Sequence, residues 1–335
     1  MQKKTETTET TETVTDGSLL LKKSLDKSLR PLSFQEFPGQ KAVKKKLEVF
    51  VQAAKSRKQT LDHVLLSGPP GLGKTTLAHI IANALGSRLV STSGPALSKK
   101  GDLAGILTNL KKGDTLFIDE VHRLSKDVEE YLYSAMEDFF IEIFTGEGLS
   151  TKSVQFPLAP FTLIVATTRV GLLKAPFRNR FGIIERLVFY EKEELMQILE
   201  RSAQLLNIYL NKEGALEIAS RSRGTPRIAN RLLRRVCDYA EVKQIKQIDK
   251  KLANFALNEL GIDTLGLDFM DRKILLWIRD KFKGGPVGIE SLAAVLNEEV
   301  DTLEEVYEPF LIQEGFLQKT ARGRVLTEKA ALHLK

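Results

Sequence analysis

Cysteine and tryptophan are almost missing from this chain. Its 335 residues include one cysteine, Cys237, and one tryptophan, Trp277. A single thiol excludes an internal disulfide and a zinc site built from several thiolates, which fits a reducing compartment. The four histidines also lack the spacing of metal ligands. We therefore expect Cys237 and Trp277 to fill apolar helix faces rather than to take part in chemistry.

Long hydrophobic runs are missing as well. No stretch reaches the roughly 18 apolar residues that a membrane-spanning helix needs. Residues 1–16 are mostly Thr and Glu with scattered Lys, so no signal peptide can be recognised there. Residues 1–28 are also poor in aromatics and cannot bury enough apolar surface to offset chain entropy. We predict a disordered tail over 1–28 and a soluble, cytoplasmic protein that does not contact a membrane.

The chain carries only a small excess of positive charge. Fifty basic and 43 acidic residues give a net charge of +7. Residues 1–28 hold equal numbers of each sign, so the excess belongs to the rest of the chain. Such an excess suits a polyanionic partner, but charge alone does not decide the function.

Apolar strands alternate with amphipathic helices after residue 29, which is typical of an α/β fold with a parallel sheet. With 42% hydrophobic residues, the chain has enough apolar surface for two or three domains. Within the first domain, 29–190, the expected helices are 40–55 and 75–85, and the expected strands are 64–66, 88–91, 115–118 and 162–166. Residues 141–156 predict an inserted β-hairpin with an exposed, apolar Ile141, Ile143 and Phe144.

The pattern changes in the second half of the chain. Residues 191–262 have helical periodicity and no strand candidate, which predicts a small all-α domain. Residues 263–335 predict helices at about 268–282, 289–297 and 301–313, followed by a basic hairpin. Three helices and a hairpin in this order are typical of a winged helix.

A glycine-rich segment follows the first apolar strand. Residues 68–75 read GPPGLGKT, which satisfies the P-loop pattern between a strand and a helix. Glycines let backbone N–H groups curl round phosphates, and the positive end of the helix dipole favours the same anions. We predict that Lys74 neutralises the β- and γ-phosphates of ATP, that Thr75 ligates Mg²⁺ and that Thr76 adds a phosphate contact.

A second motif, which consists of two acidic residues, follows the strand at 115–118. Asp119 and Glu120 end this hydrophobic strand, as in a Walker B motif that delivers its acids to the metal at the edge of a parallel sheet. We predict that Asp119 holds Mg²⁺ and that Glu120 orients and activates the attacking water. The pair therefore predicts ATP hydrolysis rather than binding alone.

Together these stretches resemble the RuvB family of AAA+ ATPases, which drive branch migration of Holliday junctions. The resemblance covers most of residues 29–335 and is carried by DHVLLSGPPGLGKTTLAHIIANALG (62–86), GDTLFIDEVHRLSKDVEEYLYSAMEDF (113–139), RSRGTPRIANRLLRRV (221–236) and EEVYEPFLIQEGFLQKTARGRV (304–325), together with 92–110 and 284–298. It implies a P-loop AAA+ core with a parallel sheet, an all-α lid and a winged helix. It also implies a homohexameric ring on double-stranded DNA, working in recombination and repair.

The resemblance carries further roles to matching positions. Thr168 is similar to the sensor-1 hydroxyl, Arg227 to a sensor-2 arginine that reaches the γ-phosphate, and Arg180 to an arginine finger that serves the neighbouring subunit. Arg178 is the rival for the last role, and Asn179 stands where the family usually has Asp. The remaining nucleotide contacts implied are Leu29, Arg30, Gly71, Lys74, Thr75, Thr76, Glu137, Asp138, Phe139, Arg180, Tyr190 and Arg227.

DNA and protein partners follow from the same resemblance. Lys319, Arg322 and Arg324 surround the predicted wing turn and suit a phosphate backbone. Lys319 stands where the family usually has Arg, so it keeps the charge but loses a bidentate grip. Hairpin 141–156 resembles the docking element for a RuvA-like junction-binding protein, although packing on its own core is the competing interpretation. A RuvC-like resolvase is implied in a larger complex with four-way junction DNA.

Six arginines between residues 221 and 235 form a dense cluster, and no acidic residue stands within this range. Since Arg227 matches the nucleotide sensor, we expect the others mostly to meet neighbouring subunits or solvent.

Two other functions fit a P-loop ATPase of this size. A protein unfoldase usually has an aromatic pore loop after the second strand, but residues 91–105 contain no aromatic residue. A clamp loader often has a cysteine cluster and a Ser-Arg-Cys finger, whereas this chain has Ala175-Pro176-Phe177-Arg178. The DNA motor is the interpretation that these residues favour.

Overall fold

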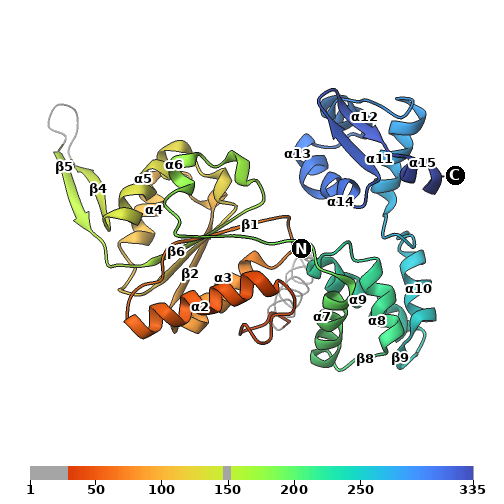
Figure 1. Ribbon diagram of the computed structural model, residues 1–335, viewed down its shortest axis with the longest axis horizontal. Coiled ribbons are helices and arrows are strands. Elements are labelled where there is room, and N and C mark those ends of the chain that lie inside the picture. Colours follow the sequence, from red (N-terminus) through yellow and green to blue (C-terminus); the bar gives the residue numbers. More distant parts are fainter. Residues whose placement is uncertain (1–28, 146–151, 335) are drawn as a thin grey trace, which may run out of the picture.

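The structure is a computed structural model that describes residues 29–145 and 152–334. Figure 1 shows an α/β part that carries a projecting hairpin, a helical part and a C-terminal part that packs helices against a small sheet. The predicted tail, 1–28, and the turn of the predicted hairpin, 146–148, lie outside the described residues. Among the described helices, none combines the length and the apolar character needed to cross a bilayer.

A five-stranded parallel sheet forms the centre of the α/β part, in the order β2-β3-β6-β1-β7. Its strands are β1 (Val64–Ser67), β2 (Leu89–Ser93), β3 (Thr115–Asp119), β6 (Thr162–Thr167) and β7 (Ile183–Arg186). The sequence predicted the first four. Strand β7 was missed because its residues alternate between buried and exposed at the sheet edge, so they form no apolar run.

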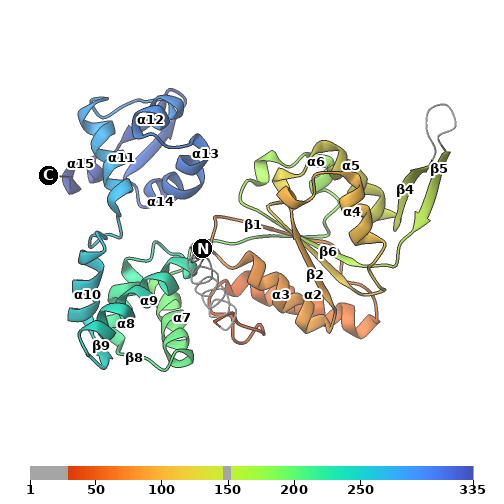
Figure 2. The ribbon, with the colours of Figure 1, turned by 180° about the vertical axis from the view of Figure 1, so that it is seen from behind.

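Helices cover both faces of this sheet (Figures 1 and 2). Side chains alternate along the strands, so Leu66 joins the apolar cluster beneath α2 (Lys41–Arg57) and α3 (Lys74–Leu85), while Leu65 joins the opposite cluster. That opposite cluster packs against α4 (Lys100–Leu107), α5 (Lys126–Glu137) and α6 (Ala175–Arg178). Short 3-10 turns η1 (Gly94–Ala96), η2 (Val121–Arg123) and η4 (Val170–Leu172) link the strands to these helices.

The predicted hairpin is present as antiparallel β4 (Phe140–Thr145) and β5 (Lys152–Pro157). It projects from the core in both ribbon views. The expectation that Ile141 is exposed was wrong, because this side chain is fully buried near the base of the hairpin and joins the cluster with α5. Ile143 is half-buried, and the side chain of Phe144 lies outside the described ones. On the other strand, Val154 and Phe156 are exposed.

The helical part contains four main helices, α7 (Lys192–Leu205), α8 (Lys212–Ser220), α9 (Pro226–Val242) and α10 (Lys250–Glu259). The prediction that 191–262 has no strand was wrong, since β8 (Tyr209–Leu210) pairs with β9 (Gln247–Ile248) in parallel. Two residues are too few for a sequence pattern. The apolar interior of this part is continuous with the cluster beneath α2 and α3.

Two arginines of the predicted cluster are interior. Arg221 is 1% exposed, and its guanidinium donates to Glu217, Asn254 and Asn258. The Arg223 guanidinium pairs with Asp268 and Asp271. The expectation that these two side chains meet solvent or other subunits was therefore wrong, because partners within the same chain, most of them distant in sequence, surround both guanidinium groups.

The C-terminal part forms its own apolar cluster. Its elements are α11 (Phe269–Asp280), α12 (Ile289–Leu296), α13 (Val300–Thr302), the π-helical turn η5 (Leu303–Tyr307), α14 (Glu308–Gln313), β10 (Leu317–Thr320), β11 (Gly323–Leu326) and α15 (Glu328–His333). Strands β10 and β11 form the predicted wing, with Lys319 opposite Arg324. The predicted helix 301–313 is divided by the π-helical turn.

Candidate nucleotide site and wing surface

Three strand ends meet at one edge of the sheet. Because β6 lies between β3 and β1, the residues after these strands, Gly68, Glu120 and Thr168, are brought to the same edge. A cavity of about 680 Å³ opens there between the α/β part and the helical part. Its volume is within the range of small-molecule sites, and polar side chains converge on it.

The loop between β1 and α3 is compact because of its glycines. Gly68 and Gly71 have φ values of 137° and 79°, which L side chains rarely adopt. A Cβ at Gly68 would lie 2.6 Å from the carbonyl oxygen of Leu187, and one at Gly71 would lie 2.7 Å from Thr225 Cγ2. The second clash shows that the helical part is packed directly against the loop.

Lys74 is the first residue of α3 and is buried. Its Nζ donates to the carbonyl oxygens of Gly68, at 2.6 Å, and Pro69, at 2.8 Å. Burial lowers the pKa of Lys74 to about 8, although Asp119 and Glu120 favour its charged form. The ammonium group is thus held inside the loop at the N-terminus of a helix, where anions are favoured.

Thr75 and Asp119 are joined across the cavity floor by a hydrogen bond of 3.0 Å from Oγ1 to Oδ2. A hydroxyl and a carboxylate are hard oxygen ligands, which suit Mg²⁺. The described residues contain no cluster of three or more His, Cys, Asp or Glu side chains able to hold a metal. A Mg²⁺ ion fits this pair because it usually takes one or two protein oxygens and completes its shell with phosphates and water.

Glu120 follows β3 in a left-handed backbone conformation, with φ at 49°. Its backbone N–H donates to Asp119 Oδ1 at 2.9 Å, and its side chain is 45% exposed. The Arg123 Nε lies 3.7 Å from one of its carboxylate oxygens. This carboxylate therefore lines the cavity while it stays accessible to water.

Thr168 lies just beyond the end of β6 and lines the same cavity. Its hydroxyl oxygen is buried and has no hydrogen-bond partner among the described residues. A buried hydroxyl without a partner carries a free-energy cost, so its position calls for a ligand group. The hydroxyl is suited to an oxygen of a bound phosphate.

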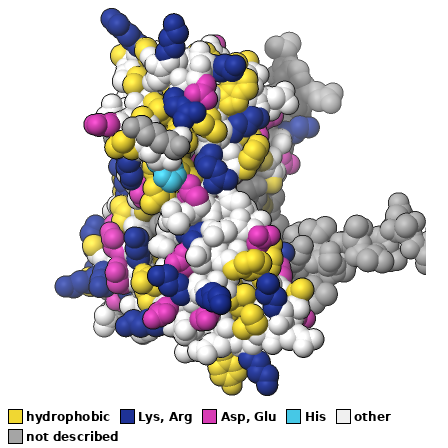
Figure 3. Space-filling model, turned by 90° about the vertical axis from the view of Figure 1, so that its right-hand side faces the viewer, with side chains coloured by type: hydrophobic (Ala, Val, Ile, Leu, Met, Phe, Trp, Pro, Cys, Tyr) yellow, Lys and Arg dark blue, Asp and Glu magenta, His cyan; other side chains and the backbone are white. Residues whose placement is uncertain are grey.

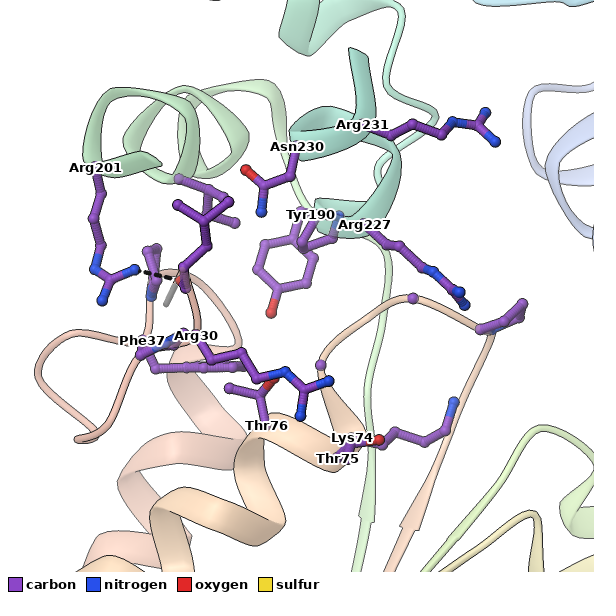
Figure 4. Close-up of a pocket in the computed structure, with 18 of the residues that line it drawn as sticks. Arg30, Phe37, Lys74, Thr75, Thr76, Tyr190, Arg201, Arg227, Asn230 and Arg231 are labelled. Carbon is purple, nitrogen blue, oxygen red and sulfur yellow. Dashed lines mark hydrogen bonds between the residues drawn. The ribbon is translucent and has the colours of Figure 1, made fainter. Parts of the chain in front are cut away.

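The helical part lines the other side of the cavity (Figure 4). Arg227 lies in the first turn of α9, and its backbone N–H approaches the Gly71 carbonyl oxygen at 3.4 Å. The Tyr190 hydroxyl donates to the Leu72 carbonyl oxygen at 3.1 Å, and burial raises the pKa of this phenol. Asn230 and Arg231 follow Arg227 along the same helix and also line the cavity.

The third wall comes from the start of the described chain. Leu29 and Arg30 line the cavity, and Figure 4 shows Arg30 above the helix that carries Thr76. Arg201 of α7 fixes this segment, because its guanidinium donates to the Leu29 carbonyl oxygen at 2.7 Å and to Glu36 at 3.1 Å. Sequence reasoning missed Arg201, since a lone arginine on an amphipathic helix carries no local signal.

Four of the predicted nucleotide contacts do not line this cavity. They are Glu137, Asp138, Phe139 and Arg180, which lie at the end of α5 and just after α6. Glu137 and Arg180 are instead joined to each other at 3.2 Å. The same guanidinium donates to the Pro176 carbonyl oxygen at 2.7 Å and lies over the Tyr133 ring, 4.2 Å from its centroid.

The wing places its predicted DNA contacts in different environments. Arg322 is exposed at the turn, and the Lys319 side chain is 54% exposed. Arg324 is 6% exposed and is paired with Glu304 and Glu308. Figure 3 shows Lys and Arg mixed with Asp and Glu on one face of the molecule, so the positive excess is not gathered into a single patch there.

Three family models match the chain in succession. They are the Holliday junction DNA helicase RuvB P-loop domain over residues 29–187, the RuvB AAA lid domain over 190–263 and the RuvB C-terminal winged helix domain over 264–335. The chain belongs to the RuvB family. Its P-loop AAA+ domain, lid and winged helix are those of a RuvB ATPase.

Named relatives agree with this membership. The Holliday junction branch migration complex subunit RuvB of Bdellovibrio bacteriovorus is 65% identical over 92% of this chain and 94% of its own length. The subunit of the same name from Flavobacterium psychrophilum is 60% identical, with 92% and 91% covered. The Thermotoga maritima RuvB Holliday junction branch migration motor superposes with a TM-score of 0.85 at 53% identity, covering 92% of this chain and 98% of that RuvB.

Proposed function

We propose that this RuvB-family ATPase is a DNA motor that drives branch migration of four-way junctions. In this account it forms a homohexameric ring on double-stranded DNA and acts with a RuvA-like junction-binding protein, with a RuvC-like resolvase in a larger complex. The single observation that carries the proposal is one cavity lined by Lys74, Asp119, Glu120 and Thr168 in a chain whose three domains all match RuvB. The named activity of the Bdellovibrio and Thermotoga relatives supports it.

The nucleotide chemistry is assigned to residues of the cavity. Lys74 and Thr76 bind ATP phosphates, Arg227 reaches the γ-phosphate from the lid, and Leu29, Arg30, Gly71 and Tyr190 complete the pocket. Bound through Thr75 and Asp119, Mg²⁺ would neutralise phosphate charge. Glu120 orients water for attack on the γ-phosphorus and accepts its proton, while the Thr168 hydroxyl donates to a γ-phosphate oxygen.

The remaining contacts are assigned to the neighbouring subunit's nucleotide. Arg180, Glu137, Asp138 and Phe139 lie outside their own subunit's cavity, so a second copy of the chain is needed to bring them to a nucleotide. Arg180 would then stabilise charge on the transferred phosphoryl group, an effect worth roughly 10³–10⁵ in rate.

A DNA motor and a protein unfoldase predict different stimulation of the same ATPase. We expect duplex DNA to stimulate hydrolysis in a salt-dependent way, because the wing contacts phosphates, and an unfolded polypeptide to have no effect. Glu120→Gln and Arg180→Ala should both abolish migration of a synthetic four-way junction in the presence of a RuvA-like protein. Substantial migration by either variant, or stimulation by polypeptide alone, would refute the proposal.

A further inference from the structure

Arg169 links the nucleotide-binding core to the winged helix. It follows Thr168 directly, and its guanidinium pairs with Asp301 at 3.0 Å and with Glu305 at 2.7 Å. The Arg169 side chain is 26% exposed and that of Glu305 is 21% exposed. The residue after the sensor hydroxyl is therefore held by two carboxylates of the domain that carries the wing.

On the core side, Arg169 belongs to the catalytic edge of the sheet. Its backbone N–H donates to Thr167 Oγ1 at 3.0 Å, and that hydroxyl also lies 3.1 Å from His122 Nδ1. His122 is two residues beyond Glu120. A short chain of contacts thus connects Arg169 with both the Glu120 turn and the end of the strand that presents Thr168.

On the winged-helix side, the acidic residues lie in one short segment, 300–308. Glu304 and Glu308 of this segment pair with Arg324, and Glu304 also pairs with Lys319 at 3.1 Å. Lys319 and Arg169 line the same groove between the domains. Segment 300–308 therefore pairs with Lys319 and Arg324 of the wing. Through Asp301 and Glu305, the same segment pairs with Arg169 of the core.

We propose that the ion pairs of Arg169 with Asp301 and Glu305 couple DNA bound at the wing to ATP hydrolysis. DNA phosphates that bind Lys319 compete with Glu304 for the ammonium group of Lys319. The resulting shift of segment 300–308 is transmitted through Arg169 to Thr168 and Glu120. Arg169 is a positioning residue in this role, because it acts through Thr167 and Thr168 rather than on the nucleotide. The inference rests on the DNA motor proposed above.

Removing the two carboxylates tests the coupling without altering the nucleotide site. We expect the Asp301→Asn, Glu305→Gln double variant to keep its DNA-free ATPase kcat and its KM for ATP. At saturating duplex DNA, the stimulation should fall by about two- to thirtyfold, the range over which mutations typically change the coupling between two sites. Asp280→Asn removes an exposed carboxylate from the same domain and should leave the stimulation unchanged.

Each result of this experiment has a distinct meaning. If the unmodified protein shows no DNA stimulation, the proposed DNA motor fails. If the unmodified protein is stimulated and the double variant is stimulated equally, the motor stands and the coupling is overturned.

A reversal of charge separates coupling from a merely structural role. Arg169→Glu should lose DNA stimulation, because it would face two carboxylates. Adding Asp301→Asn and Glu305→Arg to that variant should restore part of the stimulation by re-forming an ion pair of opposite polarity. Restoration supports the proposal, whereas a triple variant that is no more stimulated than Arg169→Glu alone contradicts it.

Discussion

At the scale of single residues, the P-loop lysine has a lowered pKa. Burial lowers the pKa of Lys74 to about 8, against the attraction of Asp119 and Glu120. Its ammonium group is held by the carbonyl oxygens of Gly68 and Pro69, which carry no formal charge. The negative charge of phosphate oxygens would stabilise the ammonium form and raise the pKa of Lys74 towards its ordinary value.

We predict that nucleotide binding at about pH 9 takes up a proton at Lys74. The sign follows from the two pKa values: between about 8 and 10.5 the free protein has lost this proton, while the phosphate-bound form keeps it. Calorimetry of ATP binding in buffers of different ionisation enthalpy measures the uptake. Lys74→Arg, whose guanidinium stays charged, should show none, and equal uptake by both proteins would contradict the assignment.

Site residues could be predicted where sequence neighbours determine their position. Lys74, Thr75 and Glu120 directly follow apolar strands or begin a helix, so strand and motif together place them. Arg201 and His122 could not be predicted, because their partners, Leu29 and Thr167, are distant along the chain. The burial of Arg324 could not be predicted either, because its partner Glu308 precedes it by 16 residues.

At the scale of elements, Arg223 joins the lid to the winged helix. Its guanidinium pairs with Asp268 and Asp271, donates to the Gly266 carbonyl oxygen and lies over the Phe310 ring at 4.8 Å. Burial raises the pKa of Asp271 to about 7, although Arg223 opposes this shift. The joint between the two domains therefore depends on a buried ion pair.

We predict that Arg223→Ala destabilises the protein by about 1–3 kcal/mol, because the buried Asp271 carboxyl would lose its charged partner and keep, among the described residues, only the Asp268 backbone N–H as a donor. Thermal unfolding measures the loss. Arg235→Ala removes a pair with Asp238 in which both side chains are about half exposed, and it should cost less than about 1 kcal/mol. Equal losses from the two substitutions would show that the joint is not held by this pair.

We propose that the exposed apolar side chains of the hairpin contact the RuvA-like partner. Val154 and Phe156 are 51% and 41% exposed, whereas Ile141 is buried. We predict that Val154→Asp with Phe156→Asp lowers junction migration in the presence of the partner, because an apolar contact would meet charge. ATP hydrolysis without the partner should not change. Ser153→Asp, a charge on the same strand, is the control; unaltered migration by the double variant would exclude this surface.

Elements were predictable when they left an apolar run or a helical period in the sequence. Strand β1 is buried throughout and forms an apolar run, whereas β7 at the sheet edge and the two-residue β8 leave no such run. The π-helical turn at Leu303–Tyr307 was also missed, because it sits inside a segment with helical periodicity. Edge position and backbone detail depend on tertiary packing, which sequence periodicity does not report.

At the scale of the whole molecule, one subunit does not bring all of the predicted nucleotide contacts to one cavity. Lys74, Glu120 and Thr168 line its cavity, but Arg180 and Glu137 are paired with each other outside it. A second copy must therefore approach for Arg180 to act on a nucleotide. We propose that this requirement makes the ring the active unit.

Mixing two inactive subunits tests this claim most directly. Glu120→Gln and Arg180→Ala proteins should each lack ATPase activity when assayed alone with DNA. In a one-to-one mixture, about a quarter of the interfaces pair an intact Glu120 with an intact Arg180, so a corresponding share of activity should return. A mixture that forms rings but stays inactive would mean that Arg180 serves its own subunit, and the composite site would be wrong.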